Sequence, residues 1–416
     1  MTFTQQWAKR AFFNFTLLAL AGILLRYKIL FPLPLVDQKH LLHAHSHFAF
    51  AGWVSLALFI GIIHLLKPND QQQKQFNNIL WTQQLSSYGM LWTFPFMGYA
   101  APSIFFSTLS ILVSFWFALV AWKMIRTNAQ LSFEKKWLYS ALLCNIISAA
   151  GTFTLAYLMA NKIINQDLYF GSVYFYLHFQ YNGWFLFTIF ALFFSQMKER
   201  MQAKHVHLAD LLFYLLLITV IPAWFLSMLW MRVPGWMSTS GAIASVLQIV
   251  ALLLFIRLLI LMRRQFRLVF HPPVHLLWLI AVIAFSLKVI MQGFSAIPAL
   301  NQYAFGIRPI VIGFLHLVLL GFVSMFIIGY LLQSRLVYLP TKFAFGGLWL
   351  FVSAMFLNEL VLMSQGLAAI FYKPFPYSNE LLLLAAGCMF TGLLLFYREQ
   401  TSKYSALNTG TQVVSS

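Results

Sequence analysis

The stretch LLHAHSHFAFAGW, residues 41–53, places His43, His45 and His47 at alternate positions where a strongly apolar run begins. Apolar runs of about 20 residues, long enough to cross a bilayer as helices, recur along nearly the whole chain. We therefore expect an all-α, polytopic membrane protein, because only helices or closed barrels satisfy the backbone inside lipid. Ionisable side chains are costly in a membrane, so the three histidines are candidates for function.

The composition excludes a long soluble domain. The chain of 416 residues is 61% hydrophobic and only 9% charged, and its mean hydropathy is +0.79. Its net charge of +18 does not indicate nucleic-acid binding, because excess Lys and Arg in a membrane protein mostly set topology. The expected partner is the lipid bilayer, with no nucleic acid.

The charge distribution predicts the topology. We expect twelve transmembrane helices, centred near residues 20, 55, 89, 114, 148, 183, 220, 251, 283, 319, 353 and 388. With a cytoplasmic N-terminus, the inner segments hold 19 of the 27 Lys and Arg residues and the outer segments hold 7, while Lys288 lies in a span. This asymmetry predicts two cytoplasmic termini. Residues 1–400 then form a single membrane domain, followed by a polar tail at 401–416.

An internal repeat links three of the predicted spans. HFAFAGW begins at His47 in the second span, HFQYNGW at His178 in the sixth, and HLVLLGF at His316 in the tenth. Each motif is His, four residues, Gly and an aromatic residue, and the glycines are Gly52, Gly183 and Gly321. The spacing predicts three pseudo-repeats of four helices, at about 1–126, 127–264 and 265–400. The alternative is that these glycines only allow close helix packing.

The three motif histidines suit a haem or metal site. Their spans all run from outside to inside, which places the imidazoles at a similar depth in the outer half of the membrane. Imidazole is the usual axial ligand of haem b and a common copper ligand. On a helix, His43 and His47 share a face, whereas His45 points the other way; if the start of the span is extended instead, all three share one face. The alternative for each histidine is a hydrogen-bonded core residue.

Further charged residues are weaker candidates. Lys288 and Glu359 lie in the ninth and eleventh predicted spans, where they either neutralise each other or contact haem propionates and carry protons. Arg308, at the outer start of the tenth span, is either a propionate partner or an interfacial anchor.

These motifs and the twelve-span pattern resemble the catalytic subunit of the haem-copper oxidase and nitric oxide reductase superfamily. The resemblance implies that His47, or a neighbour in its span, and His316 are haem ligands and that His178 is a ligand of a second metal. The chain departs from the pattern because the seventh span, LLFYLLLITVIPAWFLSMLW, has no histidine and the tenth has only one. We therefore do not expect oxygen reduction of the usual kind.

A closer resemblance is to the NnrS family of twelve-span proteins. It is carried by HSHFAFAG, which includes His45, His47 and Gly52, and by HLVLLG, which Met325 follows closely. The Glu and Met of the family's first element are absent here. The resemblance implies haem, copper as a second metal, and protection from nitric oxide, in a bacterial inner membrane.

Three functions remain open from the sequence. The first is a haem b protein in nitric oxide tolerance or respiratory redox chemistry, and such a protein could be an oxidoreductase. The second is a transporter for metal or haem that uses the intramembrane histidines, and the third is a cofactor-free assembly subunit. The chain has no C-x-x-C-H motif, so electrons would come from quinol or from an electron-donor protein.

Overall fold

The computed structural model describes residues 1–408, and in this part of the chain every regular element is helical. The chain forms two compact units. The first unit contains residues 1–117 and the chain from residue 331 onward, and the second contains residues 118–330. Helices α5 (Ala101–Thr127) and α15 (Met325–Gln333) each pass from one unit into the other.

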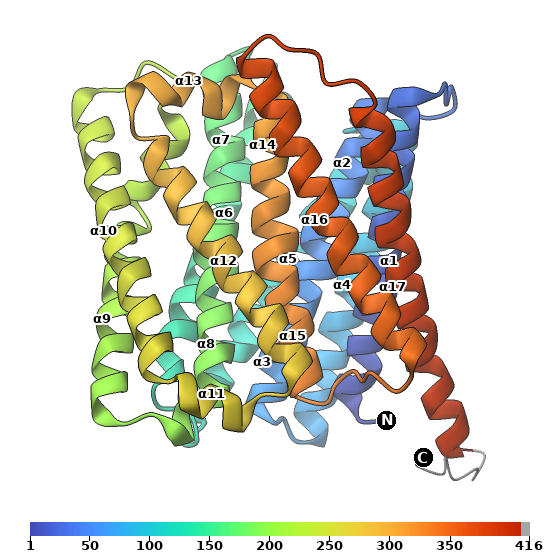
Figure 1. Cartoon of the computed structure of the whole chain (residues 1–416), viewed down its shortest axis with the longest axis vertical. Helices are drawn as coiled ribbons and strands as arrows, with labels where there is room; N and C mark the ends of the chain where they lie inside the picture. The colour runs from blue at the N-terminus through green and yellow to red at the C-terminus, as the bar shows by residue number, and fades with distance from the viewer. Residues whose placement is uncertain (409–416) are drawn as a thin grey trace. The chain divides into compact units, whose positions relative to one another are not determined.

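The first unit contains four long helices, α1, α4, α16 and α17, and one interrupted helix. Helices α16 and α17 lie side by side, and α1 packs along α17 (Figure 1). A π-helical segment, η1, interrupts the second helical run between α2 and α3. The remaining bounds are α1 (Phe3–Leu30), α2 (Gln38–Phe48), η1 (Ala49–Ser55), α3 (Leu56–Leu66), α4 (Asp70–Met97), α16 (Lys342–Ile370) and α17 (Ser378–Asn408).

The second unit contains two further π-helical segments, η2 and η5, each within a longer helical run. Helices α9 and α10 pack against each other, as do α6 and α7 (Figure 1). Its bounds are α6 (Glu134–Ala160), α7 (Gln166–His178), η2 (Phe179–Phe185), α8 (Leu186–Met197), η3 (Lys198–Arg200), α9 (Ala203–Thr219), η4 (Pro222–Met228), α10 (Gly235–Leu261), α11 (Arg263–Val269), α12 (Pro272–Phe294), α13 (Pro298–Gly306), α14 (Arg308–His316) and η5 (Leu317–Ser324).

The prediction of an all-helical, multi-pass membrane protein is confirmed. Among residues 1–408, nine helical runs are long and apolar enough to cross a membrane, and a tenth is the pair α9 and η4, which is bent by 49°. At two further positions where we expected spans, the structure has α4 and the run from α7 to α8. Both are long, but they are more polar than the candidate spans. Many of their polar side chains are buried, among them Gln83, Gln84 and Gln180. The count of twelve stays a prediction.

The two ends of the described chain meet one loop of the first unit. The Gln5 side chain donates to the Arg335 carbonyl at 3.1 Å and to the Tyr338 hydroxyl at 2.9 Å. Gln400 accepts from the Tyr338 N–H at 2.9 Å and donates to the Tyr338 carbonyl at 2.7 Å. The start of α1 and the later part of α17 therefore lie at the same end of this unit.

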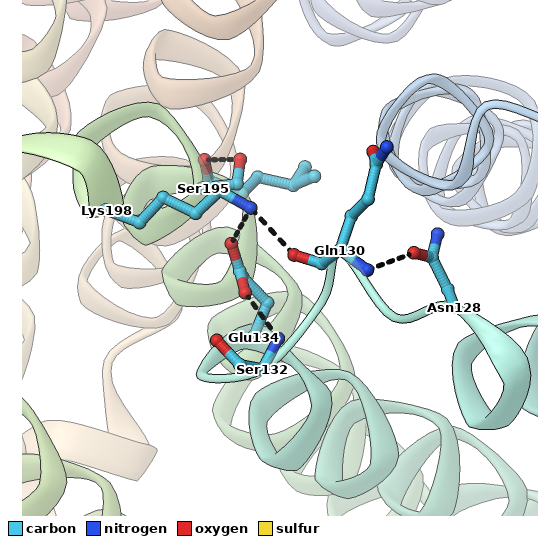
Figure 2. Close-up of polar contacts among 7 residues, drawn as sticks. Asn128, Gln130, Ser132, Glu134, Ser195 and Lys198 are labelled. Carbon is cyan, nitrogen blue, oxygen red and sulfur yellow. Dashed lines mark hydrogen bonds and ion pairs between the residues drawn. The ribbon is translucent and has the colours of Figure 1, made fainter.

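A buried carboxylate orders the loop before α6 in the second unit (Figure 2). Glu134 is fully buried and lies 3.3 Å from Lys198 Nζ, and Lys198 also donates to the Gln130 carbonyl at 3.0 Å. The Ser132 N–H donates to the other Glu134 oxygen at 3.3 Å. Lys198 thus fixes the connection between α5 and α6 to the end of α8.

Candidate functional site

Each of the three His-x4-Gly-aromatic motifs contains a π-helical segment. The segments η2 and η5 begin directly after His178 and His316, and η1 begins two residues after His47. A π-helix has i→i+5 hydrogen bonds, is rare, and is found frequently at functional sites. The motifs therefore share a backbone irregularity as well as a sequence pattern. The sequence pattern did not lead us to expect a π-helical backbone, although the five-residue spacing from His to Gly matches the π-helical repeat.

Side chains bind carbonyls of the irregular segments. Asn14 donates to the Gly52 carbonyl at 2.7 Å, and Gln83 donates to the Ala51 carbonyl at 3.0 Å. In η5, the Ser324 hydroxyl donates to the Leu319 carbonyl five residues earlier at 2.7 Å. An unpaired carbonyl in an apolar interior is costly, so these contacts stabilise the local distortion.

The motif glycines are tightly packed against protein. A Cβ at Gly52 would lie 2.8 Å from the Phe48 ring, and one at Gly183 would lie 2.5 Å from Cys144 Cβ on α6. At Gly321 the nearest atom would be Ala284 Cβ on α12, at 3.1 Å. At Gly183 and Gly321 this geometry favours the close helix packing that the sequence left as an alternative, whereas the contact at Gly52 is with Phe48 of its own helical run.

His43 and His47 share one face of α2, as their spacing predicts. The His47 ring stacks on Phe94 with centroids 4.6 Å apart, and its Nε2 lies 3.1 Å from the Tyr99 hydroxyl. The His43 ring meets Tyr99 edge-on at 4.8 Å. Tyr99 follows Gly98, which ends α4 at a positive φ of 57°. No local sequence pattern predicts this contact, because Tyr99 is more than fifty residues away from His47.

His45 faces α1 instead. Its Cε1 lies 3.5 Å from the point where a Cβ on Gly22, in α1, would stand. Its Nδ1 is buried and has no hydrogen-bond partner among the described residues. The prediction that His45 points away from the other two is therefore supported by the contacts of all three rings.

His178 uses both ring nitrogens in a buried hydrogen-bond chain. Its Nε2 lies 2.7 Å from the Val220 carbonyl, and its Nδ1 lies 3.1 Å from Asn182 Nδ2. A carbonyl can only accept, so the proton is on Nε2 and Nδ1 accepts from the amide. Asn182 Oδ1 in turn accepts from Lys288 Nζ. The chain therefore runs from Lys288 through Asn182 and His178 to Val220.

A helix break makes the Val220 carbonyl available. Helix α9 ends at Thr219, and Pro222 starts the 3-10 segment η4. The Trp224 N–H bonds the Ile221 carbonyl at 3.0 Å rather than continuing the α-helical pattern back to Val220. Proline ends the α-helix here because it has no N–H to donate.

Lys288 and Glu359 each have a neutral amide as partner. Lys288 is 3% exposed, and within its unit it has no carboxylate partner among the described residues. In the first unit, Asn358 Nδ2 donates to Glu359 Oε1 at 3.1 Å. Their mutual neutralisation stays a prediction.

His316 and Arg308 lie at opposite ends of α14. His316 is half-buried at the last residue of the helix, and Arg308 is exposed at the first. An exposed guanidinium at a helix start agrees with the interfacial-anchor alternative. Haem contacts of either residue stay predictions.

The donor atoms distinguish the histidines as ligands. Among the described residues, His47 Nε2 hydrogen-bonds the Tyr99 hydroxyl, and the ring is flanked by Phe94 and Tyr99. For His178, ligation would break one or both of its buried hydrogen bonds. No group of three or more His, Cys, Asp or Glu in residues 1–408 lies close enough to hold a metal ion.

No known protein-family model matches the chain, and no curated protein matches it.

Proposed function

We propose that the chain is a haem b-binding membrane protein in which His47 and His316 are the axial-ligand candidates. The observation that carries the proposal is the π-helical segment at each His-x4-Gly-aromatic motif, since such segments concentrate at functional sites. The resemblance to haem-copper oxidases and the NnrS family supports a role in nitric oxide tolerance or respiratory redox chemistry. The proposal includes twelve spans, cytoplasmic termini and a bacterial inner membrane.

The residues around His47 would prepare it as a ligand. Stacking on Phe94 holds the imidazole plane. The Tyr99 hydroxyl occupies Nε2 and would have to leave when a metal binds. Haem, once bound, would supply an iron that binds small gases and changes oxidation state.

The test is a reduced-minus-oxidised visible spectrum of the purified full-length protein, with iron analysis on the same sample. We expect a sharp b-type α-band, and loss of haem in His47→Ala and in His316→Ala. The matched control is His207→Ala, because His207 is exposed. Folded wild-type protein without iron would refute the proposal, as would equal haem content in all three variants.

A metal or haem transporter is the second candidate, and the broken run α9–η4 favours it. Transporters use interrupted helices whose freed carbonyls meet buried polar side chains, as Val220 meets His178 here. Proteoliposomes loaded with a metal-sensitive dye would test this function. Metal uptake that His178→Ala abolishes, in protein without haem, would favour the transporter. Protein with neither haem nor transport would leave the assembly subunit.

A further inference from the structure

The second unit contains a cavity of about 600 Å³ that shares no residue with the histidine sites. This volume lies in the range of small-molecule sites, roughly 300–1,000 Å³. Its wall comes from the start of α7, the residues directly after η4, and α13. None of the described residues that line it is charged, so the cavity suits a neutral ligand.

One side of the cavity is an aromatic wall. Phe170 meets Trp230 edge-to-face at 5.7 Å, Tyr174 lies 6.2 Å from Trp230, and Tyr174 meets Phe305 edge-to-face at 5.8 Å. The pairs are edge-to-face or tilted, with interplanar angles of 89°, 58° and 81°, so the rings present both faces and edges to the cavity. Such a surface favours a flat ring that packs against it.

Two carboxamides supply the polar part of the lining. Gln166 is exposed, and its side chain has no hydrogen bond within the described residues. Asn301 Nδ2 donates to the Leu229 carbonyl at 2.7 Å, while its Oδ1 is buried and has no hydrogen-bond partner among the described residues. A carboxamide both donates and accepts, and a buried acceptor without a donor is uncommon. The lining therefore suits a ligand with hydroxyl or carbonyl oxygens.

We propose that this cavity binds the head group of a quinone or hydroquinone from the lipid phase. Such a head group is neutral, planar and oxygen-bearing, and it dissolves in the membrane that the apolar helices imply. The ring packs on Trp230 and Tyr174, and its oxygens hydrogen-bond the Gln166 and Asn301 carboxamides. Binding here does not require haem, so this proposal and the proposed haem function can fail separately.

The experiment is calorimetric titration of the full-length protein in lipid nanodiscs with decylubiquinone. We expect saturation near one ligand per chain. Trp230→Leu and Gln166→Leu should each weaken binding about tenfold, the scale expected for a central contact. Trp230→Phe keeps an aromatic surface and should retain most of the affinity.

The matched control is Trp236→Leu, because Trp236 is 64% exposed in the same unit and does not line the cavity. Circular dichroism would establish that each variant is folded. Equal weakening by Trp230→Leu and Trp236→Leu would overturn the proposal. So would equally tight binding of decanol, since the cavity would then hold an acyl chain rather than a ring.

Discussion

The Lys288 side chain shows how one buried amine can depend on neutral partners, the Asn182 amide and the Phe285 ring, whose centroid lies 5.9 Å from Nζ. Burying an ammonium group without a counter-charge costs several kcal/mol, and here one amide oxygen faces it. We predict that Lys288→Met raises the midpoint of thermal unfolding in detergent. Asn182→Leu should lower stability by about 1–3 kcal/mol, because it leaves Lys288 and His178 without their partner. A lower midpoint for Lys288→Met would mean that a counter-charge exists.

Gly183 tests the close-packing role of the motif glycine. We predict that Gly183→Ala lowers stability by roughly 1–3 kcal/mol, because its Cβ would overlap Cys144 and force α6 away. Gly346→Ala on α16 is the matched control, since a Cβ there meets nothing within 4 Å. That change should be neutral or stabilising, as alanine favours a helix over glycine. Thermal unfolding of both variants gives the comparison, and equal effects would contradict the prediction.

At the scale of the element, the π-helical segments need partners from neighbouring helices. Asn14 on α1 is fully buried, donates to the Gly52 carbonyl, and exchanges hydrogen bonds with Gln84 at 3.0 and 2.8 Å. We predict that Asn14→Leu costs about 1–3 kcal/mol, because it leaves these groups unpaired. The control Thr82→Ala removes an exposed hydroxyl that bonds only its own helix. Chemical unfolding of the two variants should differ, and a similar cost for both would argue against a supporting role for Asn14.

Asp37 caps the helix that presents His43 and His47. The N–H groups of Lys39 and His40 donate to its carboxylate at 2.8 and 2.9 Å, and these bonds lower the Asp37 pKa below 3.8. The stabilisation is fully present above the ordinary Asp pKa of 3.8, and it is lost as the pH falls through the lowered pKa of the folded state. Asp37→Asn keeps an accepting oxygen, so we predict a weaker loss of stability below about pH 4 than in the wild type. Unfolding midpoints of the wild type and Asp37→Asn, measured from about pH 6 to about pH 3, would test this difference. If the two midpoints fall in parallel with pH, the prediction is wrong.

The sequence predicted these elements better than their contacts. Helical spacing correctly placed His43 and His47 together, and the motif marked three segments whose backbones are irregular. It did not identify Tyr99 or Val220, because both meet their histidines across more than forty residues of chain. Pro222 was a visible signal of a break, and Asn182, four residues after His178, was a visible signal of a partner. The cavity of the second unit, lined by Gln166 and Asn301 among others, is formed by several segments that are distant in sequence. No local sequence pattern predicts it.

At the scale of the whole molecule, hydropathy identifies nine or ten candidate spans among the described residues and leaves out two helical runs whose polar side chains are buried. The helix α4 contains Gln83 and Gln84, whose amides are buried and bonded inside the first unit. A helix of this kind can cross a membrane with its polar face covered by protein, although its mean hydropathy is low. The same reasoning applies to the run from α7 to α8, which contains His178, Gln180 and Asn182. The predicted twelve spans therefore depend on these two runs.

Cysteine accessibility in intact cells would decide whether the two polar runs cross the membrane. The background would be Cys144→Ala with Cys388→Ala, and the paired sites are Asp70 and Ala101 for α4, and Ile164 and Glu199 for α7 to α8, all four exposed. We predict that Ala101→Cys and Ile164→Cys react with an impermeant maleimide from outside, whereas Asp70→Cys and Glu199→Cys react only after lysis. If both members of a pair react from the same side, that run does not cross the membrane. The motif histidines of the second and sixth spans would then lose their predicted common orientation, and with it their matched depth.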